Sequence, residues 1–348
     1  MTAPTRNPDT FVVSDASSLP DLAAAPAIPG LRVRFFRDDA DYEPMAQLIA
    51  AAMSADGVPY QPTARNLQID MESNDGMDRF VDVVLVEADG RHIAGCTVER
   101  TVRDDTPMYK IEGAVHPDFR RRGLGQWLFE WSIERSKARA AVEDPGVHVK
   151  LTSWTEDASV GNVVLLQKTG FVPVRHFFLM RREGLDDIPE APLPDGLEIR
   201  PVEEGHRRAI LVAENEAFRD HWGHREMTES TVTSTFARPE VDTALWVVAW
   251  DGDEIAGVVQ NWIWPDENER LGIQRGWLEH ISVRRPWRRR GLARAITAAS
   301  LVRLREVGMT DAMLGVDSEN ANGALGLYEG LGFQRTSRAA AYRRDLEA

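Results

Sequence analysis

The chain contains an internal repeat, and this repeat restricts the folds that it can adopt. Three segments of the first half recur in the same order in the second half. They are DGRHIAG from Asp89 and DGDEIAG from Asp251, FRRRGLGQWL from Phe119 and WRRRGLARAI from Trp287, and LLQKTGF from Leu165 and LYEGLGF from Leu327. Because each half of the 348 residues is long enough to bury a core of its own, the repeat predicts two similar domains in tandem.

Each half predicts the same order of elements. Its hydrophobic patterning favours a strand, a helical region, a two-stranded hairpin with an Asp-Gly turn, a further strand, the Arg-rich turn, a helix, a strand, a short helix and a final strand. After the turn, Leu124, Leu128 and Trp131 recur at helical spacing and predict one apolar face that packs on a sheet. We therefore expect an α/β (α+β) fold in which helices flank a mixed sheet.

Segments without apolar periodicity mark the expected boundaries. Residues 1–29 contain many Pro, Ser, Asp and Ala, lack the features of a secretory signal and predict a flexible tail. Residues 184–196 are rich in Pro, Gly and Asp and predict a linker. The N-terminal domain is therefore expected at residues 30–183 and the C-terminal domain at residues 197–348.

Composition excludes several classes of protein. No apolar run approaches the roughly 20 residues that a membrane span needs. The single cysteine, Cys96, excludes an intramolecular disulfide and fits a reducing cytoplasm as a buried, inert thiol. The net charge of −14 disfavours nucleic acid as a partner. We expect a cytoplasmic monomer or homodimer that binds neither nucleic acid nor membranes.

The Arg-Gly turn predicts an anion-binding site. A strand that ends in a glycine-containing turn and opens a helix leaves several backbone N–H groups unpaired, and the helix dipole adds positive potential there. Gly123 in the first copy and Gly291 in the second allow a ligand to approach the backbone closely. An isolated cluster of this kind is commonly a solvated corner, but two copies in matched contexts favour a phosphate or pyrophosphate site.

The two turns also carry a family motif. Their spacings are Arg120-x-x-Gly123-x-Gly125 and Arg288-x-x-Gly291-x-Ala293. Both resemble the acetyl-CoA-binding motif of the GCN5-related N-acetyltransferases (GNAT), and LYEGLGF resembles a second signature of that family. The resemblance covers nearly the whole chain after residue 30, as two tandem domains. It implies mostly antiparallel sheets, acetyl-CoA as cosubstrate, no metal, and direct transfer of acetyl to a primary amine.

The resemblance also implies which residues hold the cosubstrate. In the family, the amides of the turn bind the CoA pyrophosphate and the preceding strand pairs with the pantetheine arm. The implied residues are Ile281, Ser282, Val283, Arg288, Arg289, Arg290, Gly291, Leu292, Ala293, Arg294 and Asn320 in the second copy, and Val115, Arg120, Arg121, Arg122, Gly123, Leu124 and Gly125 in the first. Asn320 has a second interpretation, as the cap of the short helix that follows it.

Proton transfer is expected in the second copy alone. Tyr328 matches the family position that supplies a proton to the departing thiolate, and the first copy has Leu166 there. Period-two alternation in GWLEHISV places Glu279 on an apolar face, where burial raises the pKa of a carboxyl and suits it to act as a base. The first copy has Ile111 at that position. A bulge in this strand would present His280 instead, and a bound water is a third option.

The two copies are therefore not equivalent. We expect acetyl transfer in the second domain, whereas the first is structural or binds acetyl-CoA without turning it over. For the acceptor pocket, the loop after Glu214 brings together Asp220, His221 and Trp222, which could orient an amine or instead cap and pack a helix pair. The acceptor could be a small amine such as an aminoglycoside or an amino acid derivative. The alternatives are a non-catalytic acyl-CoA sensor and a protein-lysine acetyltransferase.

Overall fold

The computed structural model describes residues 18–58, 62–103, 105–224, 226–238, 240–320 and 323–346. The first half contains β1 (Arg32–Phe35), α1 (Tyr42–Ala55), α2 (Ala64–Glu72), α3 (Arg79–Asp82), β2 (Val83–Ala88), β3 (Arg91–Arg103), β4 (Thr106–Val115), α4 (Leu124–Glu143), β5 (Lys150–Glu156), α5 (Val160–Lys168) and β6 (Val172–Glu183). The second half contains β7 (Glu198–Arg200), α6 (Arg207–Phe218), α7 (Glu229–Phe236), β8 (Val247–Asp251), β9 (Glu254–Val259), β10 (Asn261–Ile263), α8 (Pro265–Leu271), β11 (Arg275–Leu278), β12 (Ser282–Val283), α9 (Leu292–Glu306), β13 (Asp311–Asp317), α10 (Ala324–Glu329) and β14 (Gln334–Asp345).

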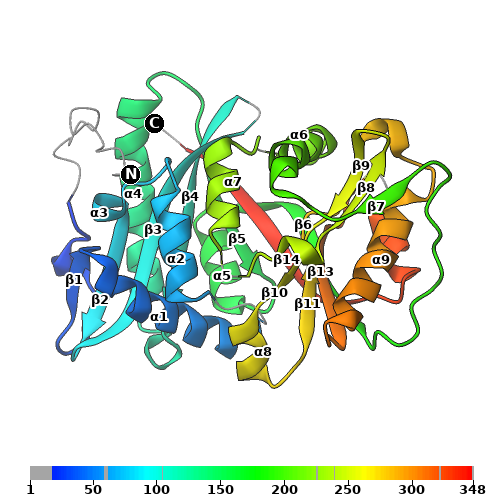
Figure 1. Cartoon of the computed structure of the whole chain (residues 1–348). Helices are drawn as coiled ribbons and strands as arrows, with labels where there is room; N and C mark the ends of the chain where they lie inside the picture. Colours follow the sequence, from blue (N-terminus) through cyan, green and yellow to red (C-terminus); the bar gives the residue numbers. More distant parts are fainter. Residues whose placement is uncertain are drawn as a thin grey trace.

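The expected order of elements is present in both halves, so the predicted α/β class is confirmed. Helices flank mixed sheets, and the two halves lie side by side (Figure 1). The hairpins β2–β3 and β8–β9 form as expected, although Asp251 and Glu254 pair with each other, so the second turn consists of Gly252 and Asp253. The second half also contains β10 and α8, which the sequence patterning did not predict.

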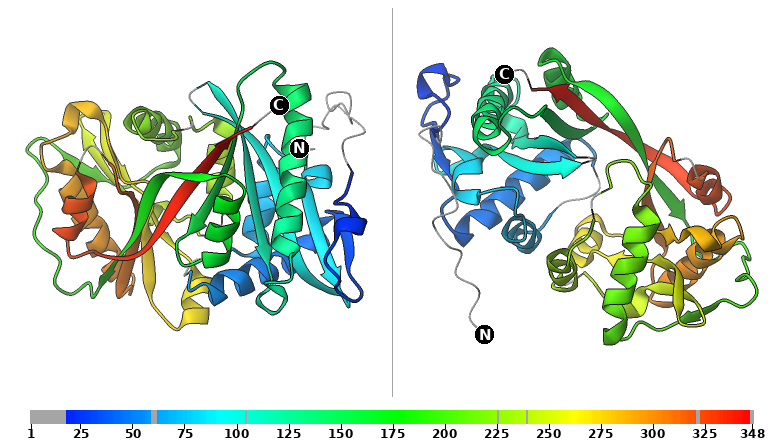
Figure 2. Two further views of the ribbon diagram at one scale, coloured as in Figure 1. Left: turned by 180° about the vertical axis from the view of Figure 1, so that it is seen from behind. Right: turned by 90° about the horizontal axis from the view of Figure 1, so that it is seen from above.

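The last strand of each half pairs with strands of the other half. β6 pairs antiparallel with β13, and β14 pairs antiparallel with both β5 and β6. Ten strands thereby form one sheet in the order β1-β2-β3-β4-β5-β14-β6-β13-β11-β10, and β12-β9-β8-β7 form a second sheet. Figure 2 shows β14 running from the second half along the first. The sequence did not predict this exchange, because alternation indicates a strand's buried face and not its partner.

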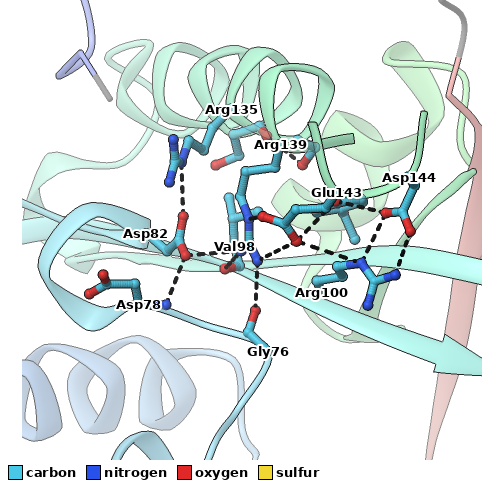
Figure 3. Close-up of polar contacts among 12 residues, drawn as sticks. Gly76, Asp78, Asp82, Val98, Arg100, Arg135, Arg139, Glu143 and Asp144 are labelled. Carbon is cyan, nitrogen blue, oxygen red and sulfur yellow. Dashed lines mark hydrogen bonds and ion pairs between the residues drawn. The ribbon is translucent and has the colours of Figure 1, made fainter. Parts of the chain in front are cut away.

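The helix after each Arg-Gly turn covers a sheet but is held in a different way. In the first half, Asp82 accepts hydrogen bonds from Arg135 Nε at 2.8 Å and Arg139 Nη1 at 2.9 Å, both from α4 (Figure 3). Arg139 also donates to Glu143 and to the Gly76 carbonyl. In the second half, the buried side of α9 is mainly apolar, down to the fully buried Leu304, and its polar residues are Thr297 and Ser300, which are uncharged.

Part of the expected N-terminal tail is packed. Residues 18–29 lie against α4: the indole Nε1 of Trp127 donates to the Asp21 carbonyl at 3.1 Å, and that of Trp131 donates to the Ser18 carbonyl at 2.8 Å. Ile28 is buried in the same apolar cluster as Trp127. The expectation of a flexible tail is therefore wrong for this segment, because its apolar side chains complete the core above α4. Residues 1–17 lie outside the described residues.

Two expectations from composition can be followed in the structure. Cys96 is buried, and burial raises the pKa of its thiol to about 12, which confirms the predicted inert thiol. Within the described ranges, no helix is long and apolar enough to cross a membrane, and no group of three or more His, Cys, Asp or Glu could hold a metal ion. The expected linker, residues 184–196, contains neither helix nor strand.

Candidate active site

The strand before the second turn is broken. β11 pairs with β10 and β13, whereas β12 pairs with β9 in the other sheet. Glu279, His280 and Ile281 lie between these two strands, and the Glu279 amide donates to the Gln260 carbonyl at 2.8 Å. The continuous alternation predicted for this strand is therefore wrong at these residues. The side chain of His280 is 44% exposed, as a bulge would present it, and Glu279 is half-buried.

This break opens the sheet beside β13. Gly315 lies in the middle of β13 and is exposed, because β12 has left the sheet at this level. The register of β11 with β13 makes Gly315 the counterpart of Ser153 in β5. Ser153 is buried, and its hydroxyl donates to the Ile111 carbonyl of β4 at 2.9 Å. In the first repeat, β4 and β5 also pair over only three residues, and the Ser153 hydroxyl bridges the two strands where that pairing ends.

The second Arg-Gly turn presents its backbone to solvent. Gly291 has φ 88°, and a Cβ placed there would meet no atom within 4 Å. The first bond of α9 runs from the Ala295 amide to the Gly291 carbonyl at 3.1 Å, so the amides of residues 291–294 precede the helical ladder. Arg289 and Arg290 are exposed beside them. This geometry fits a phosphate or pyrophosphate group held by backbone N–H groups.

The arginine that begins the motif has a bracing role in both repeats. Arg288 donates from Nε to the Val283 carbonyl at 3.0 Å and from Nη2 to the Ala217 carbonyl of α6 at 2.8 Å. Arg120 makes the same two contacts in the first repeat, to the carbonyls of Val115 and Ala52. These bonds fix the turn to the preceding strand and to the end of a helix. The structure thus supports a role for the backbone, more than for this side chain, in holding an anion.

The first turn has the same backbone shape and is also exposed, but the N-terminal segment contacts it. Gly123 has φ 91°, yet a Cβ placed there would lie 3.4 Å from Pro26 Cγ of the packed N-terminal segment. β4 is unbroken and pairs with β3 along its full length, from Thr106 to Val115. The candidate cofactor residues of the first repeat, from Val115 to Gly125, therefore surround a turn that another part of the chain contacts.

Tyr328 lies on α10 in the main apolar cluster of the second half. It is 7% exposed, and its ring contacts Phe333 edge-on with centroids 6.1 Å apart. Burial raises the pKa of its phenol above the ordinary value, so the hydroxyl is protonated at neutral pH. Its counterpart Leu166 is buried in the core of the first half.

Three ionisable side chains surround the strand break. Burial raises the pKa of the Glu279 carboxyl, and the charge of His280 offsets this in part. His280 Nδ1 lies 3.5 Å from Oε1 of Glu214, which is 2% exposed. Glu214 was absent from the residues expected to act, although its position on the apolar face of α6, four residues after the buried Ile210, is a sequence signal for an unusual carboxylate.

The three residues of the predicted acceptor loop contact different partners. Asp220 forms ion pairs with Arg285, whose Nε lies at 2.9 Å, and with Arg288, and these lower the pKa of its carboxyl. The Trp222 ring contacts Arg343, whose guanidinium carbon lies 4.5 Å from the ring centroid, and it lies near Phe177 of β6. His221 is linked to the break through the Phe218 ring, which also contacts His280.

His221 and His280 both contact one aromatic ring. The Phe218 ring is 4.7 Å from the ring of His221 and 5.8 Å from that of His280, edge-on in both cases. Burial and the charge of Arg288 lower the pKa of His221. Asn320 follows β13 and its carbonyl accepts from the amide of Gly323, the residue that caps α10. The interpretation of Asn320 as the helix cap is therefore wrong.

These features define the class of the protein. The structure has two α/β repeats, each with a glycine turn that opens a helix, and the second repeat also has a broken strand and a buried tyrosine. This arrangement agrees with the family that the sequence motifs resemble. The profile of the Acetyltransferase (GNAT) family matches residues 44–171 and 207–333. The chain belongs to this family, and it is an N-acetyltransferase with two tandem domains.

Several relatives share this tandem organisation. The mycothiol acetyltransferase of Geodermatophilus obscurus is 28% identical over 310 residues, which cover 88% of this chain and 95% of the relative. That of Salinispora tropica is 31% identical over 285 residues, which cover 77% of this chain and 88% of the relative. A GCN5-related N-acetyltransferase from Sphaerobacter thermophilus is a similar solved structure, with a TM-score of 0.69, 29% identity, and coverage of 91% of this chain and 96% of that chain.

Proposed function

We propose that this protein transfers acetyl from acetyl-CoA to the primary amine of a small molecule, and that the reaction takes place in the second repeat. The observation that carries the proposal is the break between β11 and β12 beside an uncovered turn. The first repeat has an unbroken β4 and a turn contacted by Pro26. Among the described residues, the second repeat alone combines an open strand edge, an exposed anion-binding turn and a buried tyrosine.

Acetyl-CoA fits the groups that this site provides. The amides of residues 291–294 would hold the pyrophosphate, and the backbone from Ile281 to Val283 would receive the pantetheine arm. Asn320, at the end of β13, would contact the same arm. Family members use acetyl-CoA, and the exposed Gly315 leaves space at the level where β12 separates from β13.

The reaction needs a base and an acid at this break. The uncharged amine attacks the thioester carbonyl, a C–N bond forms, and the C–S bond breaks as the thiolate departs. Tyr328 would donate a proton to that thiolate, because burial keeps its phenol protonated. Glu279 or His280 would accept the proton that the amine loses. Glu279 and His280 are two of the three residues between β11 and β12.

The acceptor is proposed to be a small-molecule amine. Two relatives that match most of this chain are named mycothiol acetyltransferase, and this supports a small acceptor over a protein lysine. Of the predicted acceptor residues, His221 lies nearest to the break through its contact with Phe218. Asp220 and Trp222, on the same loop, are proposed to line the acceptor pocket with it.

A thiol-release assay tests this proposal. Acetyl-CoA is incubated with the protein and a panel of amino sugars, aminothiols, amino acid derivatives and lysine peptides, and free CoA is followed with a thiol reagent. Release with a small amine supports the proposal. Release with peptides alone would favour a protein-lysine acetyltransferase, and tight binding of acetyl-CoA without release on any amine would favour a sensor.

A further inference from the structure

A buried carboxylate lies directly behind the strand break. Glu214 is on α6, and its side chain is 2% exposed. Oε2 accepts a hydrogen bond from Gln260 Nε2 at 2.8 Å, whereas the buried Oε1 has no hydrogen-bond partner. Leaving one oxygen of a buried carboxylate unpaired is costly. The group nearest to that oxygen is His280, whose Nδ1 lies 3.5 Å away.

His280 connects this carboxylate to the open side of the site. His280 is the middle one of the three residues between β11 and β12, and 44% of its side chain is exposed. Nδ1 faces Glu214, and the edge of the Phe218 ring contacts the imidazole with centroids 5.8 Å apart. In an imidazole, a carboxylate on one nitrogen fixes the tautomer and leaves the other nitrogen free to accept a proton. That nitrogen, Nε2, lies at the far end of the ring from Glu214.

We propose that Glu214 is a positioning residue for His280 and that His280 Nε2 is the base in the second repeat. This inference rests on the proposed acetyl transfer and makes its mechanism more specific. The Glu214 carboxylate accepts the Nδ1–H and orients the ring. As the C–N bond forms, the proton of the attacking amine passes to Nε2, and the imidazolium is stabilised by the buried carboxylate. Gln260 holds the second carboxylate oxygen in place.

The first repeat lacks all three members of this arrangement. The bonds of Arg120 and Arg288 to the carbonyls of Ala52 and Ala217 align α1 with α6, so that Glu214 corresponds to Ile49. The recurring hairpin segment aligns Gln260 with Val98, and the turn motifs align His280 with Glu112. The Glu214–His280–Gln260 arrangement is therefore confined to the repeat with the open strand edge.

The charges around His280 set the expected pH dependence. Burial lowers the pKa of the imidazole, but the interaction of Nδ1 with the Glu214 carboxylate and the charge of Glu279 outweigh it, so the pKa lies above its ordinary value. Glu214 is the charged group that faces the ring from α6, Glu279 is the adjacent residue of its own chain segment, and Phe218 and Gln260 are uncharged. A base must be unprotonated, so kcat/KM should rise with pH through a value above about 6.5.

The test compares Glu214→Gln, His280→Gln and the double variant in the full chain. With an amine that releases thiol from acetyl-CoA, we expect kcat to fall about 100-fold for His280→Gln and about tenfold for Glu214→Gln. The acid limb of kcat/KM should move to lower pH in Glu214→Gln. The double variant should be no slower than His280→Gln, because the residues act as one unit. The Kd for acetyl-CoA should change less than twofold, which separates this role from a structural one.

Specific outcomes would overturn the inference. They are an unmoved acid limb in Glu214→Gln, multiplicative losses in the double variant, or loss of the acid limb in Glu279→Gln while His280→Gln retains it. A proton NMR titration of His280 in the wild-type chain is independent of whether the variants fold, and an imidazole pKa at or below about 6.5 would equally contradict it. Failure of the wild type to release thiol with any amine would instead refute the proposed function.

Discussion

The two repeats share the Arg-Gly turn and differ in the strand that leads to it. In the first repeat, β4 is continuous and Ser153 bonds across to the Ile111 carbonyl. In the second repeat, the chain leaves one sheet after Leu278 and enters the other at Ser282. The backbone angles of the two glycines are nearly the same, φ 91° and φ 88°. The glycine turn is therefore common to both repeats, whereas the broken strand distinguishes the candidate site.

The two repeats also differ in where they place buried charge. In the first, charged side chains stabilise the far end of α4, where Asp82 pairs with two arginines. In the second, α9 packs mainly through apolar side chains. Buried charge lies instead around Arg275, which pairs with Asp311 and Glu267, and at the carboxylate of Glu214 beside the strand break. Asp82 thus stabilises helix packing, whereas Glu214 lies next to the candidate chemistry. Substitution of Asp82 should change stability, and substitution of Glu214 should change turnover.

Substitution of Tyr328 should have the largest effect on turnover. Tyr328→Phe removes the proposed proton donor while retaining the ring, so kcat for acetyl transfer should fall by about 10²- to 10⁴-fold with little change in the Kd for acetyl-CoA. Tyr342→Phe, at another buried tyrosine, is the matched control and should retain activity. Thiol release measures both. Equal activity of the two variants would remove Tyr328 from the mechanism.

Asp82→Ala should have a large effect on stability alone. It leaves Arg135 and Arg139 buried without their shared carboxylate, which should lower the free energy of unfolding by about 3–5 kcal/mol. In the second repeat, Arg303 contacts the Ala244 carbonyl at a more exposed site, and Arg303→Ala should cost less than about 1 kcal/mol. Urea unfolding measures both. A loss of kcat in folded Asp82→Ala would show that the repeats are not separable in this way.

A smaller effect should follow from introducing at Gly315 the serine that bridges the two strands in the first repeat. In Gly315→Ser, the new hydroxyl would face the Glu279 carbonyl as Ser153 faces that of Ile111. Acetyl-CoA would then compete with a hydrogen bond worth about 1 kcal/mol, so its KM should rise about fivefold. Gly315→Ala is the control, because the nearest atom to a Cβ there is Leu179 Cδ2 at 4.0 Å. Equal KM values for Ser and Ala would contradict the correspondence.

The smallest expected effect is that of the reverse change. Ser153→Ala removes the bond to the Ile111 carbonyl and should lower the free energy of unfolding by about 1 kcal/mol. It should leave the KM for acetyl-CoA unchanged, because Pro26 still contacts the first turn. A change in KM would indicate that the first repeat takes part in binding.

Much of the fold could be predicted from the repeat, because the spacing of residues within each segment indicates the element that it forms. The Arg-Gly turns, the hairpins and the buried faces of α4 and α9 all follow from spacing alone. The partner of β14 and the packing of residues 18–29 could not be predicted in this way, since both depend on contacts between segments distant in sequence. The role of Glu214 could not be predicted for the same reason, because it depends on the contact of α6 with His280 at the strand break.

Calorimetric titration with acetyl-CoA tests the central claim most directly. Asp adds a negative charge where a phosphate would lie, and the positive φ of the two turn glycines imposes a similar backbone strain on it, so the two variants are matched. The account predicts one site per chain in the wild type, one site in Gly123→Asp, and binding weakened at least tenfold in Gly291→Asp. Two sites in the wild type, or loss of binding in Gly123→Asp with binding retained in Gly291→Asp, would contradict it.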